Sequence, residues 1–224
     1  NRNRIFVLLL AVCLSLFSVA QSMSDIKKMA EQGSLGAQSM LGTSYLIGNG
    51  VAQDYKQAAY WLKKAAERGD APAQDSYGLM YAEGLGVAVD YKQAAYWFKK
   101  SAEKGYDVAQ YHIGTCYKGG LGVAKDLKQA AFWYRKSAEQ GHKNAQLDLG
   151  CFYFAGQGVE KDFQLASYWL EKAAVQGVAD AQLILGVMYS EGTIVKDVNK
   201  AKYWLQKAAD QGNENAKKEL EKLR

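Results

Sequence analysis

Five tryptophans recur at a nearly constant interval along the 224-residue chain. Trp61, Trp97, Trp133, Trp169 and Trp204 lie 36, 36, 36 and 35 residues apart. A fixed period of about 20–50 residues is the signature of supersecondary units that stack on one another. The chain is therefore expected to fold as a linear array of repeats, in which each unit buries its apolar face against its neighbours.

The first half of each repeat predicts a helix, here called helix A. The repeats begin at Ala37, Ala73, Ala109, Ala145 and Ala181. Counted from these alanines, offsets 0, 4 and 8 are apolar or aromatic, which places them on one helix face. Offset 5 is always glycine, although glycine inside a helix costs about 1 kcal/mol relative to alanine. Its recurrence predicts that another helix passes there too closely for a Cβ.

The second half predicts a helix B that runs back along helix A. It opens with an aspartate, which is a good N-cap, and in three repeats a glutamine follows three residues later, as in a capping box. These aspartates are Asp54, Asp90, Asp126, Asp162 and Asp197. A glycine, such as Gly69, stands where a left-handed residue ends a helix. Glycine-rich linkers, such as the one over residues 48–51, would turn the chain between the two helices.

These residues resemble a known family. The segment AQSMLGTSYLIGNGVAQDYKQAAYWLKKAAERG, residues 37–69, resembles the Sel-1-like repeat, a relative of the tetratricopeptide repeat. The resemblance covers residues 37–212 as five units. It implies an all-α fold, a right-handed α/α superhelical solenoid of antiparallel helix pairs. The fifth unit departs from the pattern, because its linker EGTIVKD is one residue short and lacks the second glycine.

The repeat boundaries divide the chain into eight segments. A signal peptide is expected at 1–20 and an N-terminal capping helix, equivalent to half a repeat, at 21–36. The repeats follow at 37–69, 70–105, 106–141, 142–177 and 178–212. A polar C-terminal capping helix at 213–224 would close the array, whose ends are otherwise apolar.

The first twenty residues predict export. Arg2 and Arg4 precede an apolar run over residues 5–20, and the small residues Ser18 and Ala20 have the spacing that a signal peptidase recognises. Cleavage is expected after Ala20, which would leave the protein in the periplasm or secreted. The run is short for a membrane span, which needs about 20 apolar residues. An uncleaved membrane anchor is the alternative.

The charge of the remaining chain gives no reason to expect a nucleic-acid partner. After residue 20 it has 26 Lys and Arg residues against 23 Asp and Glu residues. This excess is too small for a basic nucleic-acid-binding surface. We expect a monomer that binds a protein or peptide, uses no cofactor and meets a membrane only if the signal segment is retained.

One cluster of residues has the chemistry of a metal site. His112 and Cys116 are four residues apart on helix A of the third repeat, and Asp148 and Cys151 are three apart on helix A of the fourth. All four types bind zinc. A disulfide between Cys116 and Cys151 and two unreactive thiols at a packed interface are the alternatives, and the last is favoured.

No arrangement in the sequence predicts catalysis. The chain has only two histidines, and most carboxylates stand at helix caps or on solvated helix ends. The Gly-x-Gly pairs of the linkers follow no strand and lack a third glycine in register, so they are read as turns rather than as a phosphate loop. The chain is therefore expected not to be an enzyme.

Helix A also carries a face that varies between repeats. Offsets 2, 3, 6 and 10 lie roughly opposite the repeated face, on the side that the resemblance places in the concave groove of the superhelix. A row of residues that vary between repeats can recognise a peptide or a helix. Neutral sequence variation also accumulates at positions that packing does not constrain, which is the alternative. The candidate partner-binding residues at offsets 2 and 6 are Ser39, Thr43, Asp75, Leu79, Tyr111, Thr115, Leu147, Cys151, Leu183 and Val187.

Together these features predict an exported scaffold or adaptor protein. Tyr111, Leu147 and Leu183 are more apolar than a surface in contact only with solvent would be. This favours a partner-binding surface over neutral sequence variation. The alternatives are a cell-wall-related enzyme like the cysteine-rich members of the family, penicillin-binding or β-lactamase-like, and a membrane-anchored assembly factor. The paired cysteines that those members carry inside each repeat are missing here, so their activities are not transferred.

Overall fold

The computed structural model describes residues 22–223, and all its regular elements there are helices. The described chain divides into two compact units, one ending at Lys104 and the other beginning at Gly105. The signal peptide predicted over residues 1–20 lies outside the described residues.

The first unit contains two helix pairs behind a leading helix. Residues 22–31 form the leading helix, where the N-terminal capping helix was expected. The pairs that follow are α2 (Leu35–Ile47) with α3 (Tyr55–Glu67), and α4 (Ala71–Glu83) with α5 (Tyr91–Glu103).

The second unit contains three helix pairs and a closing helix. The pairs are α6 (Asp107–Gly119) with α7 (Leu127–Glu139), α8 (Lys143–Ala155) with α9 (Phe163–Val175), and α10 (Ala179–Glu191) with α11 (Val198–Asp210). The closing helix is α12 (Glu214–Lys222), which packs mainly on α11.

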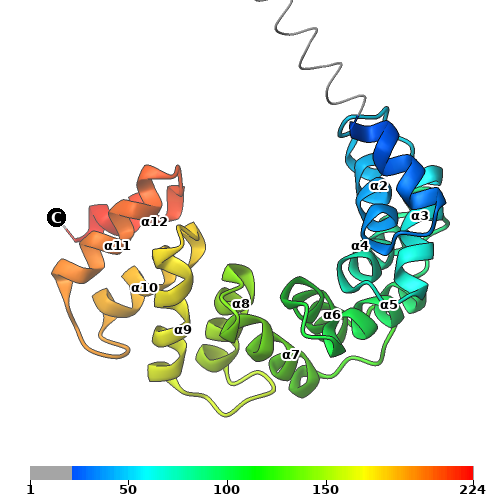
Figure 1. The fold of residues 1–224 in the computed structure, drawn as a ribbon. Coiled ribbons are helices and arrows are strands. Elements are labelled where there is room, and N and C mark those ends of the chain that lie inside the picture. The colour runs from blue at the N-terminus through cyan, green and yellow to red at the C-terminus, as the bar shows by residue number, and fades with distance from the viewer. Residues whose placement is uncertain (1–21, 224) are drawn as a thin grey trace, which may run out of the picture. The chain divides into compact units, whose positions relative to one another are not determined.

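Each A helix (α2, α4, α6, α8 and α10) packs along the B helix that follows it (Figure 1). The predicted all-α solenoid of antiparallel helix pairs is confirmed within each unit. The core of the second unit is continuous from α7 to α11, with Tyr134, Phe152 and Leu170 at or below 1% exposure. This burial is the reason for the repeat, because a single pair cannot cover both of its apolar faces.

The glycine at offset 5 marks the closest approach of A and B, as predicted. A Cβ built on Gly114 would lie 2.7 Å from the Tyr134 ring, and one on Gly150 would lie 2.7 Å from Leu170 Cγ. Both distances are far below van der Waals contact. The equivalent glycines of the other repeats face Leu62, Phe98 and Leu205 in the same way.

The aspartate N-caps are confirmed, but the capping box is not complete. The Asp54 carboxylate accepts hydrogen bonds from the backbone N–H groups of Lys56 and Gln57. The box also requires Gln57 to accept from the Asp54 N–H. That N–H instead donates to the Tyr45 carbonyl at 3.0 Å, and the same bond recurs in every repeat. The aspartate therefore ties the start of helix B to the end of helix A.

A ladder of buried glutamines joins successive repeats. In α2, α4, α8 and α10 the glutamine at offset 1 donates from Nε2 to a carbonyl near the end of the preceding B helix, as Gln146 does to Ala138 at 3.1 Å. In α2, α6, α8 and α10 the Oε1 of this glutamine accepts from the side chain of the C-cap residue of the next B helix. Gln176 donates to Gln146 at 2.8 Å, and Gln140 donates to Gln110 at 2.8 Å.

The ladder is broken at one position in the first unit. Lys104 is the C-cap residue of α5, and its ammonium donates to the Gly69 carbonyl at 2.8 Å. It makes no bond to Gln74, whose Oε1 is buried without a hydrogen-bond partner among the described residues. An unpaired buried acceptor costs about 1–3 kcal/mol.

We therefore expect Lys104→Gln to stabilise the protein. Glutamine there can donate to both Gly69 and Gln74, as Gln140 does to Gly105 and Gln110. The gain should be about 1 kcal/mol in the free energy of unfolding measured with urea. The reciprocal change Gln140→Lys should cost a similar amount. Equal stability of Lys104→Gln and the parent chain would show that the unpaired oxygen carries no penalty.

Candidate functional site

The structure places all ten candidate partner-binding residues on A helices. Asp75 is buried, at 6% exposure, and the other nine are partly exposed. Four of them (Ser39, Thr43, Asp75 and Leu79) belong to the first unit and six to the second, so the two groups are described separately.

In the first unit the polar candidates already have partners within the fold. Ser39 donates to the Asp70 carboxylate at 2.9 Å, which links α2 to the N-cap of α4. Thr43 donates to the Ser39 carbonyl one turn earlier at 3.0 Å. These hydroxyls therefore hold the helices, and they offer less to a partner than the sequence indicated.

In the second unit the candidates include a row of apolar side chains. Tyr111 on α6, Leu147 on α8 and Leu183 on α10 occupy the same offset of three consecutive A helices, and all three are partly exposed. We call these three residues the A-helix row. Tyr111 and Leu147 pack against the same buried core, and the Tyr111 ring stacks on His142 with centroids 4.8 Å apart.

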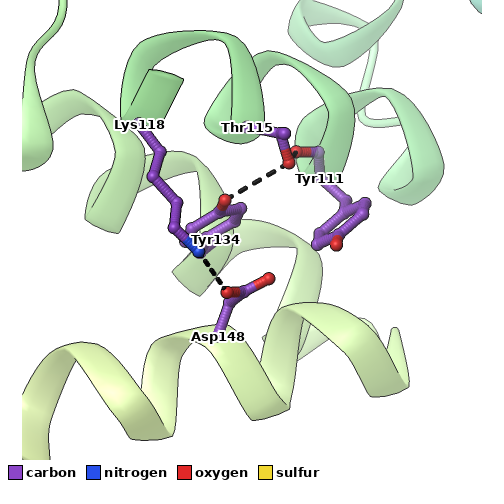
Figure 2. A network of polar contacts seen from close by, with 5 residues as sticks. All are labelled: Tyr111, Thr115, Lys118, Tyr134 and Asp148. Carbon is purple, nitrogen blue, oxygen red and sulfur yellow. Dashed lines mark hydrogen bonds and ion pairs between the residues drawn. The ribbon is translucent and has the colours of Figure 1, made fainter.

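A network of polar contacts lies beside the row (Figure 2). Lys118 on α6 donates to the Asp148 carboxylate on α8 at 2.8 Å, so the ion pair bridges two A helices. The Thr115 hydroxyl lies 3.2 Å from the Tyr134 hydroxyl and donates to the Tyr111 carbonyl at 3.1 Å. Figure 2 shows the Asp148 carboxylate below the side chains of α6.

Burial and the Asp148 carboxylate keep the phenols of this network, and burial the nearby thiols, in their protonated forms. Burial raises the pKa of the Tyr111 and Tyr134 phenols, and the Asp148 carboxylate raises both further. Burial also raises the pKa of the Cys116 and Cys151 thiols to about 11. At neutral pH the network therefore presents hydrogen-bonding groups and an ion pair, without a thiolate or phenolate nucleophile.

The proposed metal ligands are not gathered at one point. Among residues 22–223, no group of three or more His, Cys, Asp and Glu side chains is placed to hold a metal ion. The four proposed ligands were His112, Cys116, Asp148 and Cys151. The carboxylate of Asp148 is already paired with Lys118. Cys116 and Cys151 are free thiols, and the disulfide alternative is not formed.

The two thiols are expected to react slowly while the protein is folded. A thiol with a pKa near 11 is about 100-fold less ionised at pH 8 than one at the ordinary value of 9.0, and the thiolate is the nucleophile. Iodoacetamide should therefore modify both at least about 100-fold more slowly in buffer than in denaturant, with each site followed by mass spectrometry. Cys151 should react before the more deeply buried Cys116. If Cys116 in the folded protein were modified as fast as in denaturant, its side chain would not be buried as described.

A cavity of about 320 Å³ opens beside the C-terminal end of the A-helix row. We call it the α10 cavity, because most of its lining comes from that helix. Its apolar lining consists of Phe154, Leu183, Ile184, Val187 and Met188. Met188 is buried at 1% exposure, whereas Phe154 is 37% exposed.

The sequence pattern pointed to only part of this cavity. Leu183 and Val187 were candidate residues, but Phe154 was not among them. The linker residue Thr193 and the α12 residues Asn215 and Glu219 complete the lining, and α12 was expected only to cap the array. The high share of apolar residues in α10 was the one available signal.

Among residues 22–223, no helix combines the length and the apolar character that crossing a bilayer requires. The membrane-anchor alternative concerns residues 1–20, which lie outside the described residues.

Comparisons with solved structures support one family. The chain is 37% identical to a Sel1 repeat protein from Oxalobacter formigenes, with a TM-score of 0.82 over 91% of this chain and 59% of the other. It is 35% identical to a protective antigen with an SLR fold from uropathogenic Escherichia coli, with a TM-score of 0.57 over 90% of this chain and 51% of the other. The chain therefore spans between half and three fifths of the length of these two relatives.

A third structure shares the fold at lower identity. A Sel1 repeat protein from Klebsiella pneumoniae is 24% identical, with a TM-score of 0.56 over 90% of this chain and 98% of the other. No match was found among curated proteins.

A family model matches nearly the whole described chain. The Sel1 repeat model matches five times in succession, at residues 36–70, 71–106, 107–142, 143–178 and 179–213. These matches coincide with the five helix pairs and with the recurring tryptophans. The chain belongs to the Sel1 repeat family.

Proposed function

We propose that this chain is an exported scaffold that holds a protein or peptide partner on the A-helix row and the α10 cavity. Sel1-repeat proteins are in general scaffolds for protein–protein interaction, and their solenoid is typically non-enzymatic. The proposed export rests on the basic and apolar pattern of residues 1–20.

One observation carries this proposal. The same offset of three consecutive A helices presents a partly exposed apolar side chain, whereas that offset is serine in α2 and buried aspartate in α4. Helical grooves bind partners through apolar anchors set at regular intervals. The Lys118–Asp148 pair beside the row provides a donor and an acceptor that can also bond to a partner's backbone.

A capture experiment with two matched triple variants tests the proposal. The first variant is Tyr111→Ala, Leu147→Ala and Leu183→Ala. The control is Phe132→Ala, Tyr168→Ala and Tyr203→Ala, which truncates three B-helix rings that are 47%, 50% and 54% exposed. Both would be used as bait on periplasm and culture medium of the producing cell, after their helicity and melting temperature are measured.

We expect a partner that the parent chain and the B-helix control retain and that the A-helix variant loses. The few hot-spot residues of an interface cost about 2 kcal/mol or more when they are truncated to alanine, about thirtyfold in affinity. A partner retained by the A-helix variant and lost by the control would place the binding surface on the B helices and contradict the proposal.

A further inference from the structure

The α10 cavity is unusual in the charge of its lining. Beside its five apolar residues it is lined by the carboxylates of Glu191 and Glu219 and by two neutral polar residues. No Lys or Arg is among the described residues that line it. An apolar opening whose only charged lining groups are carboxylates is complementary to an apolar side chain with a cation next to it.

The two carboxylates are accessible to an incoming cation. Glu191 is exposed at the end of α10 and has no ion-pair partner among the described residues. Glu219 pairs with Lys222 at 2.6 Å, and the side chains are 30% and 68% exposed, so the Lys222 ammonium is largely in solvent. Exposed pairs of this kind contribute about 0–1 kcal/mol, so a partner's cation can replace Lys222 at little cost.

The size of the cavity fits one bulky side chain. Pockets that enclose small molecules run from about 300 to 1,000 Å³, and this one, at about 320 Å³, is at the lower end. The buried Met188 contributes to its lining, and a flexible thioether adapts to aliphatic and aromatic side chains alike. This is the form of an interface pocket that receives one anchor residue.

We propose that the α10 cavity binds a segment of a partner protein in which a bulky apolar residue is flanked by Lys or Arg. The apolar side chain enters between Phe154 and Val187, and the cation pairs with Glu191 or Glu219. This inference rests on the proposed function and specifies the chemistry of the partner.

Selection from a random dodecapeptide library displayed on phage, with the full chain as target, tests this inference. The enriched peptides should combine Leu, Ile, Phe or Met with Lys or Arg within one helical turn. A synthetic copy of an enriched peptide should bind the Val187→Phe variant about thirtyfold more weakly, because the new ring fills the cavity that the anchor needs. Its control is Val175→Phe, the same substitution at a side chain that is 68% exposed on α9 and outside the cavity, which should leave affinity unchanged.

Charge reversal tests the cation separately. Glu191→Lys should weaken the same peptide about fivefold, the value of an exposed ion pair, and changing the peptide's basic residue to Glu should restore the loss. Glu83→Lys, at the equivalent offset of α4, is the control and should have no effect. The affinity difference should shrink at high salt because exposed pairs are screened.

Several results would overturn the inference. These are enriched peptides without a basic residue, binding unaffected by Val187→Phe, and no enrichment at all. If the chain self-associates in sedimentation experiments and Val187→Phe abolishes that association, the occupant of the cavity would be a second copy of the chain instead.

The failure of this inference can be distinguished from the failure of the proposed function. Peptides whose binding is lost on Tyr111→Ala or Leu147→Ala, but unchanged by Val187→Phe, would reject this inference and leave the proposed function standing. Partner capture that ignores the A-helix row would reject the proposed function itself.

Discussion

Replacing Phe152 with alanine is expected to destabilise the unit that begins at Gly105 by about 3–5 kcal/mol. Phe152 is 1% exposed in the continuous core, and its ring meets the Tyr134 ring edge-on with centroids 5.3 Å apart. Removing the ring leaves a void that helices held on both sides cannot close. The melting temperature should fall by about 6–20 °C, from about 2–4 °C per kcal/mol for a chain of this size.

Phe132→Ala is the matched control for this prediction. Phe132 is 47% exposed on α7, so its truncation opens no cavity and should change stability by less than about 1 kcal/mol. Equal losses for the two variants would contradict the assignment of Phe152 to the core.

Replacing Gly158 with alanine is expected to cost about 2–5 kcal/mol. Gly158 has a φ of 67°, and left-handed backbone costs other residues about 1–2 kcal/mol. Its Cβ would also collide with the Leu127 carbonyl and lie 2.8 Å from the Lys128 nitrogen, both at the start of the preceding B helix. Overpacking against backbone adds about 1–3 kcal/mol. Denaturant unfolding followed by circular dichroism would measure the loss.

Gly177→Ala separates the two costs. Gly177 has a φ of 84°, and a Cβ there would have no neighbour within 4 Å. It should lose only the conformational part, about 1–2 kcal/mol. Equal losses at Gly158 and Gly177 would show that the contact between the linker and the preceding helix contributes nothing.

The local structure within one repeat was predictable from the sequence. The glycine at offset 5 predicted a close helix approach, and Leu170 stands 2.7 Å from where a Gly150 Cβ would lie. The aspartate N-caps followed from the same reading. These features depend on residues of a single repeat, and the same pattern recurs in all five repeats of the sequence.

Backbone contacts between successive elements, both within a repeat and between repeats, were less predictable. The Asp54 N–H pairs with Tyr45 instead of Gln57, and the Gly158 linker rests on Leu127 of the preceding repeat. Both contacts set how elements stack, which periodicity along the chain does not encode. The α10 cavity was missed in part for the same reason, because Phe154, Val187 and Glu219 come from three different helices.

The metal hypothesis assumed that side chains at the same offset of successive A helices, such as His112 and Asp148, come close enough to share one ion. Zinc needs about four ligands within about 2.0–2.3 Å, and among residues 22–223 no three side chains of the right types converge on one point. Equivalent positions on successive A helices therefore form a row rather than a cluster. The same geometry that disfavours a metal site spaces Tyr111, Leu147 and Leu183 as anchors along an extended partner.

Site-specific photocrosslinking tests the central claim most directly. A benzophenone amino acid would replace Leu147, in the A-helix row, or Tyr168, on the B-helix side of the same repeat, in the full chain expressed in its own cell. We predict a discrete crosslinked protein from position 147 and none from position 168. A crosslink from position 168 alone would contradict the account, because the partner would then contact the B helices and not the A-helix row.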